Sequence, residues 1–362
     1  MKGVILVENS FVHPYMPNSV PENKKAMLDE LGINSVEDIY KSIIPDELLY
    51  KERLDIPEPI RSEYELKRHV MGILNRDITT EEYTSFLGAG CYKHQVPAIC
   101  DEINSRGEFL TAYCGDTYSD HGKMQAIFEY TSMMGELLDT DVVSYTTYDG
   151  GQAVASSLRM AVRAVREKGM AGKVILVPKT MNPEIYSQVV QYCRNVAEVR
   201  KIAYEPETGL MDLEELKEQL AKKNVAAVFF ENPTYLGNFE TRGEEIAKLA
   251  HDAGAYCVVQ TEVAALGIME SPVNQGADIV CGDIQPLGMH IQFGGGQAGF
   301  IACNQNMDLV EQFPTYMYGI TETEKEDTYG WGRAMNYRSS HGSRENAKEY
   351  FGTETGLWAI TA

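Results

Sequence analysis

Four residues whose side chains can do nucleophilic or acid–base chemistry lie in the polar segment 111–125, TAYCGDTYSDHGKMQ: Tyr113, Cys114, Asp116 and His121. A cysteine, a histidine and an aspartate are the residue types of a nucleophilic triad, in which the base activates the thiol. Closeness in sequence does not place them in that geometry. Polar loops beside rigid elements often carry binding residues, so we interpret the segment as a loop that contacts a substrate or a partner.

A second candidate site is the glycine pair in YDGGQAVASS, where Tyr148, Gly150 and Gly151 precede a helical pattern. Free amides at a helix N-terminus can bind an anion such as phosphate, because the helix dipole favours negative charge there. A tight strand-to-helix turn that binds nothing has the same pattern. Both interpretations stay open at the level of sequence.

A glycine triplet, Gly294, Gly295 and Gly296, stands in FGGGQAG. No Lys-Ser/Thr pair follows it, so it is not a phosphate-binding P-loop, and it does not open a helix as a dinucleotide fingerprint would. We expect a backbone turn at a point where another group approaches closely.

The triplet closes a stretch of strand, loop and strand, DIVCGDIQPLGMHIQFGGGQAGF at 278–300, which lacks a lysine. In enzymes that use pyridoxal phosphate (PLP), a stretch of this shape usually carries the lysine that bonds to the cofactor. Here Lys248 is followed by no other lysine until Lys325. Without an amine at this place, the chain cannot form that covalent link.

Composition excludes several classes of function. The chain has 362 residues, 44% hydrophobic and 23% charged, as in an ordinary globular protein with room for a large domain and a smaller one. Its net charge of −21 argues against a polyanion partner. No apolar run is long enough to cross a bilayer or to serve as a secretory signal, so we expect a cytoplasmic protein.

Cysteines and histidines predict neither disulfides nor a metal site. The seven cysteines are odd in number and form no C-x-x-C pair, and those in apolar strand-like runs are expected to be buried thiols: Cys257, Cys281 and Cys303. The seven histidines are scattered and join no cysteine cluster.

Alternating strand and helix patterns must position these candidates. We expect helices at 124–138, 152–169, 183–195, 212–223 and 244–254. Strands are expected at 173–178, 199–205, 226–231, 255–261, 277–282 and 297–303. The alternation predicts a mainly parallel sheet with helices on both faces.

Parallel sheets of this kind bind ligands at the carboxyl ends of their strands, which directs attention to 148–151, 231–235, 260–262 and 283–287. Within the third range, a carboxylate at Glu262 could pair with a pyridinium nitrogen, but we favour a helix-capping role for it.

The two ends of the chain have other patterns. An N-terminal helical pattern stops at Gly32, and Ser35 is expected to cap the next helix. The last nine residues read as the start of an apolar helix, which suggests a missing C-terminal piece. We expect an N-terminal arm and helical segment at 1–85, a large α/β domain at 86–312 and the start of an incomplete C-terminal domain at 313–362.

Several long strings resemble one family in a fixed order. HPYMPNSVPENKKAMLDELGI, TSFLGAGCYKHQVPAICDEINSRGEFLTAY and MQAIFEYTSMMGELLDTDVVSYTTYDGGQAVA are followed by ENPTYLGNFE and GDIQPLGMHIQFGGGQAGFIA. Together they resemble the N-terminal half of glycine dehydrogenase (decarboxylating), the P-protein of the glycine cleavage system. In many bacteria that half is a separate polypeptide, subunit 1. The similarity covers most of the chain.

The resemblance implies a PLP-dependent transferase type I fold, like that of aspartate aminotransferase, with a mainly parallel seven-stranded sheet. It also implies that PLP is bound by a partner, the lysine-bearing subunit 2, and not covalently by this chain, which completes the active site. In the implied reaction, glycine is decarboxylated and its aminomethyl group passes to the lipoyl H-protein. A dimer or heterotetramer is the implied assembly.

Two departures from the family pattern leave alternatives open. The family has a Thr-Pro-Tyr-Gln segment where this chain has 111–125, and it continues beyond the point that corresponds to Ala362. A diverged paralogue that acts on another small amine or amino acid, or a non-catalytic scaffold or regulatory subunit, would also explain the sequence.

The interpretation of 111–125 generates a test. Asp116→Ala is expected to lower the turnover of the complex without dissociating it, because a loop residue at a partner's active site contributes to chemistry more than to assembly. Turnover and size-exclusion profiles of the complex measure the two effects. Wild-type turnover in a well-folded variant would contradict the loop assignment.

Overall fold

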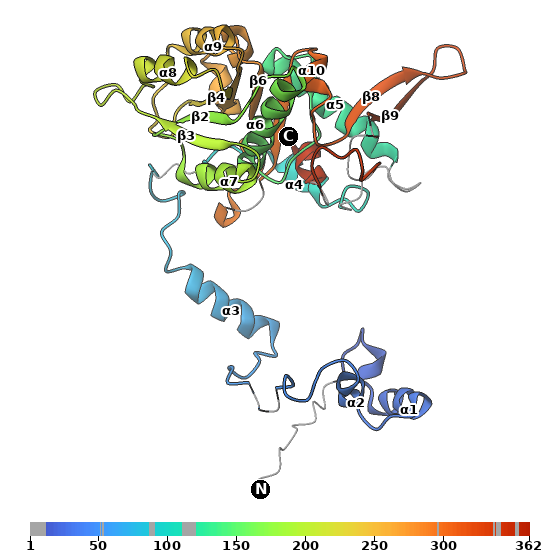
Figure 1. Cartoon of the computed structure of the whole chain (residues 1–362). Coiled ribbons are helices and arrows are strands. Elements are labelled where there is room, and N and C mark those ends of the chain that lie inside the picture. The colour runs from blue at the N-terminus through green and yellow to red at the C-terminus, as the bar shows by residue number, and fades with distance from the viewer. Residues whose placement is uncertain are drawn as a thin grey trace. The chain divides into compact units, whose positions relative to one another are not determined.

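The computed structural model describes residues 12–50, 52, 54–86, 91–110, 121–294, 297–335, 337, 342–351 and 355–362, without the side chains of His121 and Phe293. The chain divides into two compact units, Met1–Ile78 and Thr79–Ala362 (Figure 1). None of the helices in the described part of the chain combines the length and the apolar character that crossing a bilayer requires.

The first unit contains short helices, and the predicted stop at Gly32 is confirmed. They are η1 Pro17–Ser19, α1 Pro21–Leu31, α2 Val36–Lys41 and α3 Glu63–Leu74. Gly32 terminates α1 with a φ of 67°, a conformation that costs glycine little. Ser35 starts α2 in a capping box with Asp38, so the predicted cap is confirmed.

The second unit is built on a seven-stranded sheet in the order β1-β7-β6-β5-β4-β2-β3. Its strands are β1 Val142–Val143, β2 Val174–Pro178, β3 Glu198–Ile202, β4 Val225–Asn232, β5 Tyr256–Thr261, β6 Ile279–Asp283 and β7 Gly299–Cys303. Strand β7 pairs antiparallel with both β6 and β1, and the pairs among β2 to β6 are parallel. The predicted mainly parallel sheet of seven strands is confirmed.

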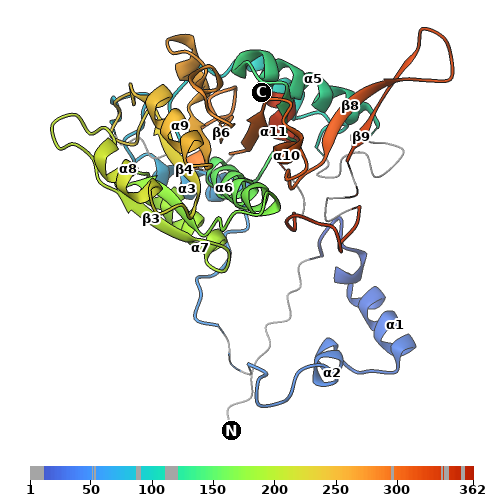
Figure 2. The same ribbon diagram turned by 45° about the horizontal axis from the view of Figure 1, so that its top comes forward.

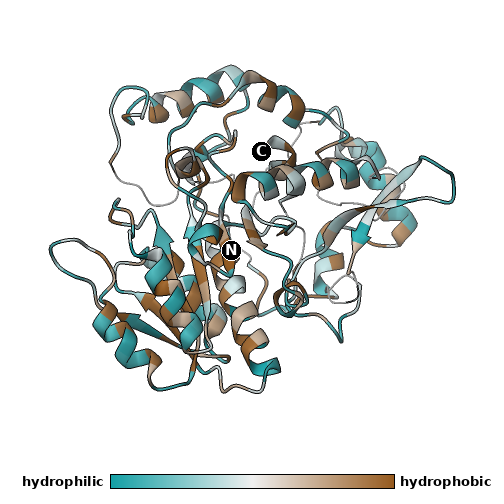
Figure 3. Cartoon of the chain, turned by 90° about the horizontal axis from the view of Figure 1, so that it is seen from above, coloured by the Kyte–Doolittle hydropathy of each residue, from teal (hydrophilic) through white to brown (hydrophobic). Residues whose placement is uncertain are grey.

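Helices cover both faces of the sheet. One face packs against α6 Gly150–Glu167, α7 Pro183–Cys193 and α10 Met307–Val310; the other packs against α5 His121–Leu138, α8 Leu213–Leu220 and α9 Gly243–Asp252. Figure 3 shows apolar and polar stretches alternating along these helices. Smaller elements are α4 Ala98–Asn104, η3 Val263–Gly267, η4 Pro272–Gln275 and η5 Gln292–Gly294.

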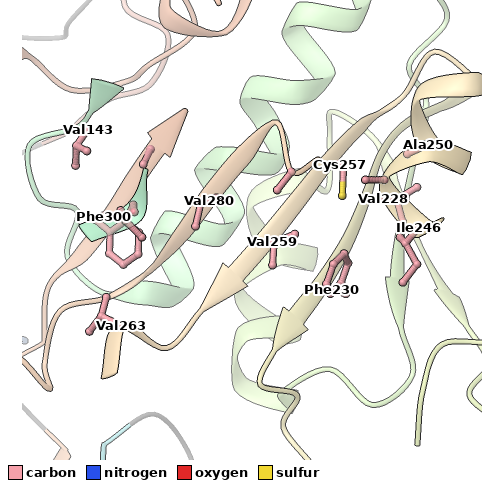
Figure 4. Packing of buried hydrophobic residues seen from close by; sticks show 14 of the residues in the cluster. Val143, Val228, Phe230, Ile246, Ala250, Cys257, Val259, Val263, Val280 and Phe300 are labelled. Carbon is pink, nitrogen blue, oxygen red and sulfur yellow. The ribbon is translucent and has the colours of Figure 1, made fainter. Parts of the chain in front are cut away.

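Side chains of each strand alternate between two buried clusters, which explains why the strands read as almost continuous apolar runs. In β4, Val228 and Phe230 point into the cluster under α8 and α9, whereas Ala227 and Phe229 join the cluster under α6. Figure 4 shows the first of these clusters, with Phe300 at one end and Ile246 near the other. The expected burial of Cys257, Cys281 and Cys303 is confirmed.

Sequence patterns were least informative after Phe313. That region contains an antiparallel hairpin of β8 Met317–Glu322 and β9 Tyr329–Ala334, which the sequence analysis did not identify. Glycines interrupt both strands and weaken the strand signal. The expected apolar helix near the C-terminus is present as α11 Gly356–Thr361. The predicted helix at 212–223 ends earlier, at Leu220, and Lys223 then adopts a φ of 51°.

A buried carboxylate ties the segment 342–351 to the outer face of α6. Glu349 Oε1 accepts from Arg159 Nε at 2.9 Å and from an Arg163 guanidinium nitrogen at 3.1 Å. Its Oε2 accepts from the Ser156 hydroxyl at 2.7 Å. The Glu349 side chain is only 7% exposed, so this ion pair lies in a poorly solvated position.

Replacing Glu349 by alanine is expected to destabilise the fold by about 3 kcal/mol, because it leaves two half-buried guanidinium groups without their shared carboxylate. Urea unfolding of the isolated chain measures the change. Glu345→Ala removes an exposed carboxylate from the same segment and is the matched control, expected within about 0.5 kcal/mol of wild type. Equal loss in both variants would contradict a specific role for Glu349.

Candidate functional site

The carboxyl ends of three neighbouring strands meet the start of α6. Strand β4 ends at Asn232, β5 at Thr261 and β6 at Asp283. The turn that leads into α6 contacts the last of these, because Gly150 donates its N–H to Asp283 at 2.8 Å. This is the edge at which open parallel sheets bind ligands.

Two carboxylates occupy the N-terminal end of α6. Asp149 is the N-cap, and its Oδ1 accepts from the Gln152 N–H at 2.6 Å. Its Oδ2 accepts from the Gln188 side chain at 3.3 Å. Asp283 Oδ2 accepts a hydrogen bond from the Gly150 N–H. Both negative groups therefore lie where the positive end of the helix dipole would attract an external anion.

Close packing fixes this arrangement. A Cβ atom added at Gly150 would lie 3.0 Å from the Asp283 Cβ atom. A Cβ atom at Gly299, where β7 begins, would collide with Thr147 and with the Asp149 backbone. The backbone approaches the Asp283 carboxylate as closely as a glycine permits, so a phosphate group does not fit beside Gly150 while Asp283 keeps this position.

Burial changes the acidity of Asp283. Removal from water raises the pKa of its carboxyl group from 3.8 to about 7, against the opposing effect of the backbone donors Gln285, Gly150 and Ala298. The Gln285 N–H approaches Oδ1 to 2.8 Å. A carboxyl group with this pKa can change its proton near neutral pH, unlike an exposed aspartate.

Two further carboxyl groups follow the neighbouring strands. Burial raises the pKa of Glu231, in β4, to about 7, although the Asn182 N–H donates to it at 3.1 Å. Burial likewise raises the pKa of Glu262, just after β5, to about 7. Glu262 caps the helical turn η3 by accepting from the Ala264 N–H at 3.3 Å, so the favoured capping role is confirmed.

Small cavities lie between these groups. Two cavities of about 70 Å³ each share four lining residues: Asn182, Ile185, Gln260 and Asp283. Ligand pockets for small molecules usually measure at least roughly 300 Å³. Each of these cavities by itself has room only for water or a very small group. Within the described residues, no three metal-ligating side chains come close enough to bind an ion.

A wider hollow of about 670 Å³ adjoins this edge. It is lined by 80–85, 91–93 and Ile291, and Tyr92 lines both the hollow and one of the small cavities. Lys93 in its wall pairs with Glu81 at 3.2 Å. The hollow has the volume of a pocket for a small molecule, and the sequence analysis did not identify it.

Most of the predicted loop residues lie outside the part of the chain that the structure describes. Tyr113, Cys114 and Asp116 lie outside the described residues, and His121 begins α5 with its side chain outside them as well. No contact in the described part of the chain tests the assignment of 111–125.

The predicted glycine sites are better defined. Gly150 and Gly151 form the first turn of α6, as expected for a strand-to-helix turn, and the Tyr148 ring stacks on Phe351 at 5.9 Å. Gly294 ends η5 with a φ of 88° and lines neither small cavity, whereas Gly295 and Gly296 lie outside the described residues. The sequence analysis named the range 283–287 but assigned no role to Asp283. The signal was a carboxylate at the end of a buried strand.

Comparison with known sequences gives a consistent result. Residues 13–362 match the family described as glycine cleavage system P-protein. Two similar curated proteins are each named probable glycine dehydrogenase (decarboxylating) subunit 1. The one from Staphylothermus marinus is 34% identical over 97% of this chain and 74% of its own length; the one from Carboxydothermus hydrogenoformans is 36% identical over 96% and 76%.

Solved structures are similar at two levels. An inhibitor-bound glycine decarboxylase (P-protein) of the glycine cleavage system aligns with a TM-score of 0.78 and 30% identity, covering 97% of this chain and 75% of its own. A sphingosine-1-phosphate lyase from Burkholderia pseudomallei aligns with a TM-score of 0.57 at 15% identity, over 88% of this chain and 71% of its own. The second likeness concerns the fold alone.

The raised pKa of Asp283 predicts how the stability of the fold depends on pH. The folded chain holds this proton more tightly than the unfolded chain, so the group's contribution to stability falls as pH rises from about 4 to about 7. Asp283→Asn removes that dependence. Between about pH 4 and about pH 8, wild type is expected to lose on the order of 3 kcal/mol relative to the variant.

Urea unfolding of both chains across this pH range measures the difference. Glu218→Gln, at an exposed position on α8, is the control. Its free energy of unfolding is expected to change with pH in parallel with that of wild type. A constant gap between wild type and Asp283→Asn would show that Asp283 has an ordinary acidity in the folded chain.

Proposed function

This chain belongs to the glycine cleavage system P-protein family, and on that premise we propose that it is the lysine-less subunit of a two-subunit glycine dehydrogenase (decarboxylating). It acts as part of a decarboxylating oxidoreductase complex and is inactive alone. Its partner is a homologous subunit that carries the PLP-binding lysine. The complex decarboxylates glycine and passes the aminomethyl group to the lipoyl arm of an H-protein.

The observation that carries this proposal is the carboxylate of Asp283 on the Gly150 N–H. A helix start with free N–H groups can bind an anion. In this chain the Gly150 N–H donates to an internal carboxylate, and no lysine lies between Lys248 and Lys325. The missing lysine and the occupied Gly150 N–H both support our assignment of the cofactor to the partner.

The contribution of this chain is then to position and to shield. The hollow lined by 80–85 and 91–93 offers walls large enough to receive a loop of the partner or part of a substrate. The loop residues Tyr113, Cys114, Asp116 and His121 are proposed to contact the partner's active site. Closing such a site excludes water, which strengthens the electrostatic interactions inside it.

The first test concerns the cofactor. The purified chain, incubated with PLP and reduced with borohydride, is expected to show no stoichiometric pyridoxyl label at any one lysine, because no amine lies at the carboxyl edge. The complex with the second subunit is expected to show one label per pair of chains, on the second subunit. Peptide mapping by mass spectrometry locates the label. A stoichiometric label on this chain would refute the assignment.

The second test concerns the reaction. The complex is expected to exchange labelled bicarbonate into the carboxyl group of glycine, and neither subunit alone should do so. Alanine in place of glycine is the substrate control. Exchange with another small amino acid but not with glycine would favour the diverged paralogue, and a stable complex without exchange would favour a scaffold role.

A further inference from the structure

The hairpin of β8 and β9 projects from the second unit. Its two strands form a sheet of their own, and Figures 1 and 2 show it extending away from the rest of that unit beside α5. The base is anchored, because Met317 and Tyr318 are buried. Beyond that base the hairpin leaves the core, and the turn at 323–328 forms its tip.

One face of the hairpin is apolar and exposed. Ile320 lies opposite Trp331, and Glu322 lies opposite Tyr329, so these side chains share a face. Ile320 is 46% exposed, Trp331 37% and Tyr329 56%. Tryptophan and tyrosine are the residue types most enriched where one protein binds another.

The opposite face is almost bare backbone. Gly319 pairs with Gly332, and Thr321 pairs with Gly330. A Cβ atom added at Gly319 or Gly332 would meet no atom within 4 Å. A two-stranded ribbon with open edges and an exposed apolar face is marginal in water, so burial of this face against another surface would stabilise it.

The charge at the tip of the hairpin indicates which charge a covering surface would carry. Four exposed carboxylates accompany a single lysine: Glu322, Glu324, Glu326 and Asp327, with Lys325. No ion pair among the described residues engages any of the five. A covering surface that also contacts the tip is complementary to it when it supplies positive charge. A second copy of a chain with net charge −21 does not, because it would bring like charges together.

We propose that the β8–β9 hairpin is a docking arm for the lysine-bearing partner subunit, which receives it in an apolar groove rimmed by lysine or arginine side chains. The identity of this partner rests on the proposed function above. The groove contacts Ile320, Trp331 and Tyr329, and the basic rim contacts the tip. The glycine face lets the groove wall approach the ribbon backbone closely.

The experiment measures the dissociation constant between this chain and the second subunit of the same organism, purified with its PLP, by isothermal titration calorimetry. The apolar variant is Ile320→Ser with Trp331→Ser. The charge variant combines Glu322→Gln, Glu324→Gln, Glu326→Gln and Asp327→Asn. Two matched controls lie elsewhere: Ile268→Ser, at a side chain 82% exposed, and a set of four neutralised glutamates at Glu214, Glu218, Glu244 and Glu245.

The apolar variant is expected to raise the dissociation constant about thirtyfold or more, since it removes a central aromatic contact. The charge variant is expected to raise it about tenfold at about 50 mM salt and much less at about 500 mM, because salt screens exposed charges. The dissociation constants of both controls should stay within about twofold of the wild-type value. This holds for the control with four neutralised glutamates even though its net charge equals that of the charge variant.

Unchanged dissociation constants in both hairpin variants, with wild-type unfolding midpoints, would overturn the docking arm and leave the proposed function standing. Failure of the wild-type chain to bind the second subunit would overturn both. A wild-type homodimer that the apolar variant converts to a monomer would assign the hairpin to self-association and would also overturn the proposal.

Discussion

The first turn of α6 presents backbone amides that have no acceptor inside the helix, and in this chain two carboxylates accept from them. Asp149 does so from the preceding residue, and Asp283 does so from the end of a strand 133 residues away. The second contact brings β6 and α6 together at the carboxyl edge of the sheet. The cavities at this edge are small and lined by carboxyl groups.

The second unit combines a well-packed sheet with a carboxyl edge whose cavities are small. The sheet retains two well-packed faces, so the fold does not depend on a cofactor for its core. Three carboxyl groups with pKa values near 7 lie at the carboxyl edge of the sheet. The edge therefore becomes more negative as pH rises through about 7.

The surfaces available to a partner lie away from the carboxyl edge or beside it. The hollow next to Tyr92 has the volume of a binding pocket, and the hairpin beside α5 exposes aromatic side chains next to a negatively charged tip. The segment 342–351 is held on the turn and helix at the carboxyl edge, because Glu349 binds Ser156 and Arg159 of α6 and Phe351 stacks on Tyr148.

The sequence alone determined strands β2 to β7 of the main sheet, its mainly parallel character and the absence of a lysine between 249 and 324, because periodicity and residue identity are local properties. It also determined which strand ends deserve attention. Only the tertiary structure decided that Asp283 caps α6, that Glu349 binds Ser156 from 193 residues away, and that residues 317–334 form a projecting hairpin. Those contacts join segments distant in the chain, and their geometry follows from packing, which no local pattern encodes.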